Sequence, residues 1–419
     1  GSARASLEAN AYLQSLVGGD HFSVGLASRQ MGIAKVHSNI LAKYNAPSIK
    51  QIEKSDFILV VAEDITQTSP RIALAVRQAL KNVAIEKADL LGIPSWQDSA
   101  VRTIGGEDKT PLYSLQCVPT KLDTVSKYSE LLSPQNILDA LDFVLSSLES
   151  TTFENNKLSV KQKGAFEQLV AELLSAKSPL IVSGWSHQDA HILNQIERIT
   201  SALKERNADC RAQLCILPPS ANSVGVMSLM KENTLSTEDV ISLSQSNEID
   251  GVIVLENSLD SLDSKALQTL KENTSVIISL DHSENKTTRI ADIVLPTSTV
   301  TESDGHFVNY QGYLQRFYQV HVVDRPIQEN WHWLNELSQS LFNLSQKLMT
   351  YTELNQYLNE TLKGWPINVE DGETTLDSHI SNGVARQTQR VSGRTSQSAN
   401  ITVHEGKSLS SCHQVNEHE

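Results

Sequence analysis

The sequence is poor in cysteine. It has four cysteines in 419 residues, and none of them forms a C-x-x-C pair. Iron–sulfur clusters need several thiolates close together, commonly in a C-x-x-C-x-x-x-C run. We therefore expect no cluster on this chain, and we expect its thiols to be reduced and scattered. The four are Cys117, Cys210, Cys215 and Cys412.

Long apolar runs and basic runs are also missing. The longest apolar stretches, such as 57–62 and 251–255, have the length of a strand, whereas a membrane span needs about 20 apolar residues. The N-terminus shows no secretory pattern. The net charge is −14, from 35 basic and 49 acidic residues, and nucleic-acid surfaces need clustered Lys and Arg. The composition predicts no direct membrane span and no nucleic-acid partner.

Phosphate-binding glycine motifs are absent: the sequence contains neither G-x-G-x-x-G nor G-x-x-x-x-G-K-[ST]. In doubly wound folds, ligands bind at the carboxyl ends of strands. The strand predicted at 57–62 is followed by Glu63, and the one at 251–255 by Glu256. Carboxylates there would repel a pyrophosphate, so we expect no nucleotide at either end. Gly184, after a third predicted strand, permits a phosphate but is too little to indicate one.

Strand and helix patterns alternate along the chain. Stretch 57–62 is apolar throughout, as in a strand buried on both faces of a parallel sheet. Pro70 then suits a first helical turn, and Ile72, Val76 and Leu80 follow at helical spacing. This alternation predicts an α/β fold with parallel sheets and helices on both faces. Further strands are predicted at 111–117, 180–183, 209–217, 251–255, 276–280 and 290–295, and further helices at 4–17, 134–148, 161–177, 187–203, 261–271 and 330–344.

Several segments give weaker signals. Residues 21–26 are interpreted as a short strand, 31–44 stay ambiguous, and 122–132 have the composition of a loop or frayed helix. Residues 150–157 are polar and are interpreted as a linker. After Pro366 the chain is polar and lacks aromatics, so it is interpreted as a linker towards a domain that is not present.

Two histidines suggest a site, but a structural role explains them better. His187 and His191 have the spacing of an H-E-x-x-H zinc site. Gln188 stands where that motif has its glutamate, and no third ligand follows nearby. We interpret the pair as polar residues on an early helical turn. The stretch 184–188 likewise lacks the second glycine of a nucleophile elbow.

The stretch 289–317 has the most specific pattern. Its first turn carries Glu302, Asp304 and His306, which have the chemistry of an acid–base cluster but are explained more simply as capping groups in a turn. Gly305 in this turn is expected to have a positive φ. A second turn is predicted at 309–312, followed by an extended segment.

This order of residues resembles the molybdopterin oxidoreductase fold. There, a strand ending in A-D-x-V-L-P leads to a glutamate, a glycine, an N-x-x-G turn and a Q-R pair. Tyr313 stands where that family usually has a basic residue. The matching residues are 291–296, Glu302, Gly305, Asn309, Gly312, Gln315 and Arg316.

A narrower resemblance covers nearly the whole chain. The sequence is similar to the large iron–sulfur subunit, the G subunit, of bacterial NADH-quinone oxidoreductase, respiratory complex I, in its gamma-proteobacterial type. The matching stretches are 1–10, 60–68, 71–79, 254–257 and 392–405. In that family the cysteines that bind the 4Fe-4S and 2Fe-2S clusters belong to upstream domains, and none maps onto the cysteines here.

The resemblance implies two doubly wound, mostly parallel-sheet lobes of the molybdopterin oxidoreductase type. One lobe would comprise 1–50 and 161–345, the inserted lobe 51–160, and 346–419 would form a helix and polar linker. The chain is expected to be part of a longer protein, to hold no cofactor itself, and to carry no catalytic, cofactor-binding or metal residue.

The resemblance also implies a place in the cell. The expected partners are the other subunits of the peripheral arm of complex I, on the cytoplasmic face of the inner membrane. The intact enzyme would transfer electrons from NADH to quinone and translocate protons. The alternatives left open are a fragment of a working molybdenum or tungsten oxidoreductase and an independent binding module.

Overall fold

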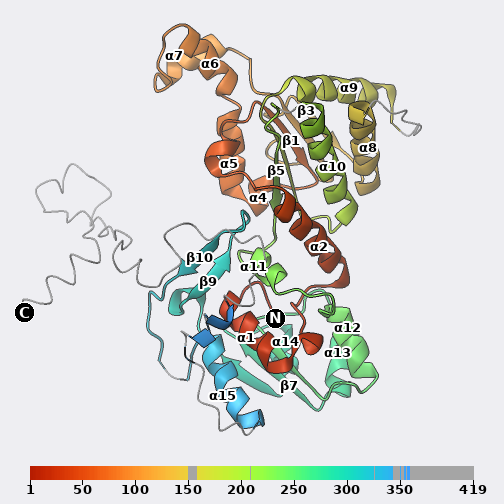
Figure 1. The fold of residues 1–419 in the computed structure, drawn as a ribbon, viewed down its shortest axis with the longest axis vertical. Coiled ribbons are helices and arrows are strands. Elements are labelled where there is room, and N and C mark those ends of the chain that lie inside the picture. Colours follow the sequence, from red (N-terminus) through yellow and green to blue (C-terminus); the bar gives the residue numbers. More distant parts are fainter. Residues whose placement is uncertain are drawn as a thin grey trace, which may run out of the picture. The chain divides into compact units, whose positions relative to one another are not determined.

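The computed structural model describes residues 1–149, 158–207, 209–324, 326–342, 350, 353–354 and 356–358. Residues Gly1–Pro366 form one compact unit. Helices and strands alternate along it (Figure 1). The strands are β1 Phe57–Val61, β2 Leu112–Gln116, β3 Tyr128–Leu131, β4 Pro179–Gly184, β5 Gln213–Leu217, β6 Gly251–Leu255, β7 Val276–Asp281, β8 Ile293–Pro296, β9 Gly305–Val308 and β10 Leu314–Phe317.

Seven of the fifteen helices in the described residues are predicted from the sequence, in the ranges 4–17, 70–80, 134–148, 161–177, 187–203, 261–271 and 330–344. In the described part of the chain, no helix is both long and apolar enough to cross a membrane. The helices are α1 Leu7–Val17, α2 Ser28–Lys43, α3 Ile49–Ile52, α4 Ile65–Thr68, α5 Pro70–Ala79, α6 Asn82–Leu90, α7 Asp98–Gly105, α8 Pro134–Glu149, α9 Val160–Ser175, α10 Ala190–Arg206, α11 Ser223–Ser228, α12 Thr237–Gln245, α13 Ser264–Asn273, α14 Lys286–Ile290 and α15 Asn330–Phe342, with 3-10 turns η1 Gly19–His21 and η2 Val300–Glu302.

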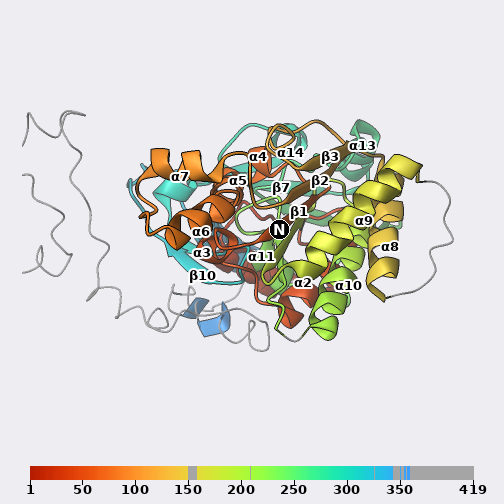
Figure 2. The same ribbon diagram turned by 90° about the horizontal axis from the view of Figure 1, so that it is seen from above.

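Five parallel strands form the larger sheet, in the order β3-β2-β1-β4-β5. Every residue of β1 is buried, which explains why its sequence is apolar without alternation. Helix α5 covers one face of this sheet, and α8, α9 and α10 cover the other (Figure 2). The predicted α/β class with parallel sheets is therefore confirmed.

This sheet crosses the boundary expected at residue 160. Strand β4 pairs with β1 from Phe57↔Pro179 to Val60↔Val182, and β5 pairs with β4. The resemblance places both strands in the lobe formed by 1–50 and 161–345, but their backbone hydrogen bonds join them to β1, β2 and β3. The other expected boundaries stay predictions, and most of 346–419, like the linker 150–157, lies outside the described residues.

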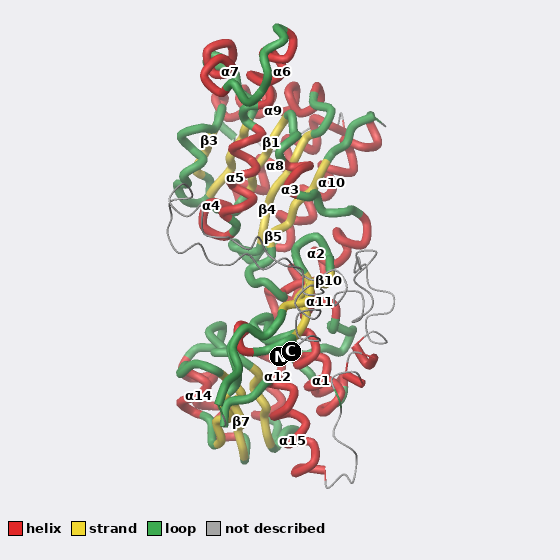
Figure 3. The backbone as a smooth tube through the Cα atoms, turned by 90° about the vertical axis from the view of Figure 1, so that its left-hand side faces the viewer, coloured by secondary structure: helices red, strands yellow, loops and turns green. Residues whose placement is uncertain are grey.

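A second parallel sheet has the order β6-β7-β8. Figure 3 shows the strands of both parallel sheets in yellow. Side chains of β6, β7 and α13 form a buried cluster that includes Val254, Leu267, Leu270 and Ile277, with α12 residues packed against it. The carboxyl ends of these three strands lead into the site described below.

Strands β9 and β10 form an antiparallel hairpin with Gly305 opposite Phe317. The predicted turn at 309–312 is confirmed, and Gly312 has φ +83°. Asn309 Oδ1 accepts from the backbone N–H of Gln311 and of Tyr313, at 2.9 and 3.0 Å. The expectation for Gly305 is wrong: it begins β9 and is not among the positive-φ residues.

Gly305 is instead required by close packing. A β-carbon built there would lie 2.7 Å from Cζ of Phe317 and 2.8 Å from Cβ of Ser6. Real β-carbons do not approach other atoms so closely, so a larger residue would displace its neighbours. The sequence suggested a turn because glycine is common in turns, but this glycine gives room to a phenylalanine across the hairpin.

Three segments with weak signals have clear structures. Residues 21–26 form no strand, since only an isolated bridge joins Ser23 to Leu235. The ambiguous stretch 31–44 is helical and forms most of α2. The stretch 122–132 contains β3, an edge strand whose residues are half-buried or exposed, so it lacks the apolar run of an interior strand.

Candidate functional site

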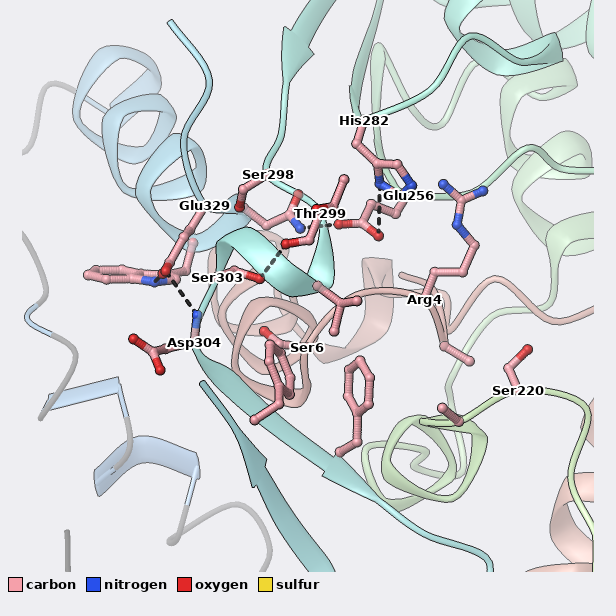
Figure 4. Close-up of a pocket in the computed structure, with 17 residues that line it drawn as sticks. Arg4, Ser6, Ser220, Glu256, His282, Ser298, Thr299, Ser303, Asp304 and Glu329 are labelled. Atoms are coloured by element: carbon pink, nitrogen blue, oxygen red, sulfur yellow. Dashed lines mark hydrogen bonds and ion pairs between the residues drawn. The ribbon is translucent and has the colours of Figure 1, made fainter. Parts of the chain in front are cut away.

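A cavity of about 320 Å³ lies where β6, β7 and β8 end and α15 begins (Figure 4). Glu256 follows β6, His282 follows β7, and Ser298 and Thr299 follow β8. Ligands of open parallel sheets bind at this edge, so the cavity is the candidate site of the chain. The other lining residues are Ala3, Arg4, Ser6, Ser220, Ala221, Val300, Ser303, Asp304, Phe307, Phe317, Glu329, Asn330 and Trp331.

The arginine of this cavity is engaged by a buried carboxylate. Arg4 Nη2 donates to Asp281 Oδ1 at 2.7 Å, and the Asp281 side chain is completely buried. Asp281 also accepts from the Ser283 N–H at 3.1 Å and from Asn285 Nδ2 at 2.8 Å. The positive charge of Arg4 is therefore largely balanced within the chain.

Three further carboxylates line the cavity: Glu256, Asp304 and Glu329. Burial raises the pKa of Glu256, partly offset by a hydrogen bond from Asn330 Nδ2. Burial also raises the pKa of Glu329, which accepts from the Asp304 N–H at 3.0 Å. His282 Nδ1 lies 3.7 Å from Glu256 Oε2. Acidic groups thus outnumber the basic groups that remain free to meet a ligand.

Two buried polar atoms of this cavity have no hydrogen-bond partner among the described residues. They are Oδ1 of Asn330 and Oγ of Ser298, on residues that are 9% and 3% exposed. Phe307, Phe317 and Trp331 supply apolar walls. The cavity therefore combines unpaired acceptors, carboxylates and aromatic surface, which favours a ligand that donates hydrogen bonds.

The carboxylate predicted at the end of β1 accepts hydrogen bonds from another residue of the chain and does not point to a ligand site. Glu63 is 2% exposed and accepts from the Ser186 N–H at 3.1 Å and from Ser186 Oγ at 2.7 Å. Ala62 just before it has φ +54°, and Glu256 has φ +42°. Each of the strands β1 and β6 is thus followed by a residue with a strained backbone, and a buried glutamate lies at each strand end. Glu63 occupies the space beside Gly184, at the end of β4 that the sequence left open.

The interpretation of His187 and His191 as residues of one early helical turn is wrong. Helix α10 begins at Ala190, and Asp189 caps it by accepting from the His191 N–H at 2.9 Å. Gln188 has φ +49°, so the chain turns between the two imidazoles. The side chains that the structure describes include no group of three or more His, Cys, Asp or Glu placed to hold a metal ion.

Glu302, Asp304 and His306 serve separate purposes. Glu302 accepts from the N–H and the hydroxyl of Thr299, both at 2.9 Å, which makes it the expected capping group. His306 pairs with the buried Glu8 of α1. Only Asp304 lines the cavity. No pattern in the sequence indicated the long-range partners Glu8, Asp281, Glu329 and Asn330, because folding alone brings them to this edge.

The described cysteines are free thiols. Cys210 and Cys215 are buried and Cys117 is half-buried. Burial raises the pKa of Cys215 to about 12 and also raises the pKa of Cys117 and of Cys210. None of the three lines the cavity, and Cys412 lies outside the described residues.

The sequence and the fold of the chain match a known class of proteins. Residues 143–340 match the family model of molybdopterin oxidoreductases. A formyltransferase/hydrolase complex from Methylorubrum extorquens, solved with methylofuran, shares the fold with a TM-score of 0.53 and 14% identity, over 81% of this chain and 90% of that one. The chain thus has a molybdopterin oxidoreductase-type fold.

Individual relatives give a more specific match than the family model does. The chain is 31% identical to the G subunit of NADH-quinone oxidoreductase from Pseudomonas putida over 97% of its own length, and 30% identical to that from Salmonella typhimurium. It is a homologue of this G subunit, and this confirms the resemblance seen in the sequence. The chain spans 45% of the length of these relatives.

Proposed function

We propose that this chain is the pterin-like structural region of the G subunit of a complex I, and that it carries no cofactor. It contributes folded surface for the assembly of the peripheral arm, and no electron-transfer step takes place on its own residues. In the intact enzyme, clusters bound by cysteines upstream of this region would carry electrons from NADH towards quinone. The other subunits of the peripheral arm are its partners, and the complex lies on the cytoplasmic face of the inner membrane.

One observation supports this proposal most directly: the strand ends that would face a pterin dinucleotide present carboxylates. Glu256 and Glu329 line the cavity, and Glu63 fills the space beside Gly184. A pyrophosphate needs backbone amides and glycines at such ends. The donor that could serve it, Arg4, is already bound to Asp281. The residues present do not fit the phosphates of this cofactor.

If the role of this chain is structural, a destabilising variant should lower the amount of assembled complex without changing the activity of each assembled complex. Gly312→Val strains a positive-φ turn in a chain that is proposed to hold no cluster. We expect membranes of cells carrying this variant to hold less assembled complex, while NADH-dependent quinone reduction per assembled complex stays unchanged. Gly164→Ala, on α9 with open space around it, is the matched control. A loss of turnover at normal assembly would contradict a structural role.

Metal analysis tests the alternative, a working molybdenum or tungsten enzyme, which the comparisons do not favour. The complex is purified through a tag on this chain, and molybdenum, tungsten and iron are measured by mass spectrometry. We expect iron from the clusters and only traces of molybdenum and tungsten. A stoichiometric amount of either of these two metals would overturn the proposal.

A further inference from the structure

We propose that the cavity at the ends of β6, β7 and β8 binds a primary ammonium group. The group belongs either to a small free amine or to a lysine side chain of a neighbouring subunit. This inference goes beyond the structural role proposed above, and only its lysine alternative rests on the proposed membership of a complex. It rests on the lining of the cavity: a carboxylate, two unpaired acceptors and an aromatic wall.

Two buried polar atoms of the lining need hydrogen-bond donors. Asn330 Oδ1 and Ser298 Oγ are buried without a partner among the described residues, and a buried polar group left unpaired destabilises the fold. An amide oxygen can only accept, and a serine hydroxyl can accept as well as donate. A ligand that donates N–H groups would satisfy both atoms. Figure 4 shows Ser298 and Glu256 among the residues around the cavity.

The charge of the lining favours a cation. Glu256, Asp304 and Glu329 line the cavity, and Arg4 is bound to Asp281. His282 is the remaining basic side chain in the lining. The start of α15 would by itself favour an anion, but Glu329 already places a carboxylate there, directly before the helix. A second anion would meet repulsion, whereas a cation would be attracted.

The free acceptors suit an ammonium better than a guanidinium group. Asn330 Nδ2 already donates to one carboxylate oxygen of Glu256, so a guanidinium that binds through two parallel hydrogen bonds would have to share that oxygen. An ammonium has three N–H donors, which matches the acceptors on Glu256, Asn330 and Ser298. The aromatic walls would contact the alkyl part of the ligand, and a cation near an aromatic ring gains further attraction.

The size of the cavity fits such a group. Its volume of about 320 Å³ lies at the lower end of the range for small-molecule pockets. A short alkylamine, or the end of one lysine side chain, fits in that space, whereas a dinucleotide cofactor does not. The proposal therefore concerns a small ligand or a single side chain.

The test compares two cations of equal charge. The thermal unfolding of the full 419-residue chain is measured with n-propylammonium chloride and with trimethylpropylammonium chloride at the same ionic strength. The quaternary ion has no N–H group. We expect the first to raise Tm in a saturable way and the second to leave Tm unchanged. An equal response to both ions, or no response to either, would overturn the proposal.

Two variants on the same cavity refine the test. Ser298→Ala removes one acceptor and keeps the backbone bond from Ser298 N–H to Gln328, so it should weaken propylammonium binding by about tenfold. Ser220→Ala is the matched control, since Ser220 lines the cavity but its hydroxyl is not among the buried atoms without a partner. If both variants bind propylammonium as tightly as the original chain, the assignment of Ser298 is wrong and the proposal falls.

The last measurement separates the two sources of the ammonium group. The same titration is repeated on the purified complex that contains this chain. A response of the isolated chain alone assigns the group to a lysine of a neighbouring subunit, which would already occupy the cavity in the complex. A response of both assigns it to a free amine. Because assembly and turnover are not read out here, failure of this test leaves the structural role unaffected.

Discussion

The carboxylate of Glu63 lies against the backbone of Gly184. A β-carbon built on Gly184 would be 2.2 Å from Oε2 and 2.5 Å from Cδ of that glutamate. Glu63 is held there by Ser186, and it is nearly completely buried. The end of β4 therefore has room for either a side chain at 184 or the glutamate, but not for both.

Gly184→Ala should consequently destabilise the chain by about 1–3 kcal/mol, because overpacking in a buried site forces a shift of its neighbours. Urea unfolding monitored by circular dichroism measures this. Gly164→Ala is the control, since nothing lies within 4 Å of its added β-carbon and helical Gly→Ala gains about 0.5–1 kcal/mol. Equal stability of the Gly184→Ala variant and the original chain would show that Glu63 can leave this position.

Substitutions at the two glycines of the β9–β10 hairpin should destabilise the chain for different reasons. Gly312→Val should cost about 1–3 kcal/mol because valine is strained at positive φ. Gly305→Val should cost a similar amount because its side chain would collide with Phe317 and Ser6. Unfolding free energies from urea titrations give both values.

Two milder substitutions separate these causes. Gly312→Asn should recover part of the stability, because asparagine tolerates the left-handed region. Gly305→Asn should recover none, because its β-carbon still meets Phe317. If Gly305→Asn recovered stability, close packing would not be the cause at residue 305. If Gly312→Asn recovered none, the positive φ would not be the cause at residue 312.

The buried His37 makes stability depend on pH. Burial lowers its pKa to about 3 from an ordinary 6.5, and its Nδ1 accepts from Trp185 Nε1 at 3.2 Å. Between these two values the unfolded chain binds a proton at this residue and the folded chain does not. Stability from His37 is therefore present above pH 6.5 and is lost as the pH falls below it, by about 2 kcal/mol at pH 5.

The measurement is a difference between two chains. Urea unfolding is followed at pH 7.5 and pH 5 for the original chain and for His37→Gln, whose amide oxygen can still accept from Trp185. The variant should lose less stability on acidification, because one titrating group is gone while the other groups are unchanged. If both chains lose the same amount, His37 is not the group responsible.

Local patterns predict much of the fold. Stretch 57–62 is recognisable as a strand because burial on both faces demands an apolar run. Strand β3 escapes prediction because an edge strand shows no such run. The pairing of β4 with β1 across residue 160 escapes it for a related reason: parallel strands of two sheets look alike, and only the folded chain shows which of them are neighbours.

The site can be predicted only in part. A carboxylate at Glu256 is expected because it directly follows a recognisable strand. Its partner Asn330 lies 74 residues further along the chain, and Arg4 lies 277 residues before Asp281. Such pairs follow from the packing of elements, which no local spacing contains. The sequence thus indicates that the strand ends would repel a phosphate, but it does not indicate the unpaired acceptors on the residues that line the cavity.

Burial should also order the reactivity of the thiols. Thiolate is the reactive form, and burial raises the pKa of Cys215 to about 12. Cys117 is only half-buried, although burial raises its pKa too. When the folded chain is alkylated with iodoacetamide at about pH 8, near the ordinary pKa of a thiol, and its peptides are analysed by mass spectrometry, Cys117 should react first. Cys215 should react only as fast as the chain unfolds.

A control in denaturant distinguishes burial from intrinsic chemistry, because there all cysteines should react at similar rates. The variant Leu214→Ala adds a second check. Leu214 precedes Cys215 on β5 and is 2% exposed, so its truncation should destabilise the core by about 2–5 kcal/mol. It should therefore speed the alkylation of Cys215 without changing that of Cys117. A Cys215 that reacts as fast as Cys117 in the folded original chain would mean that β5 opens without global unfolding.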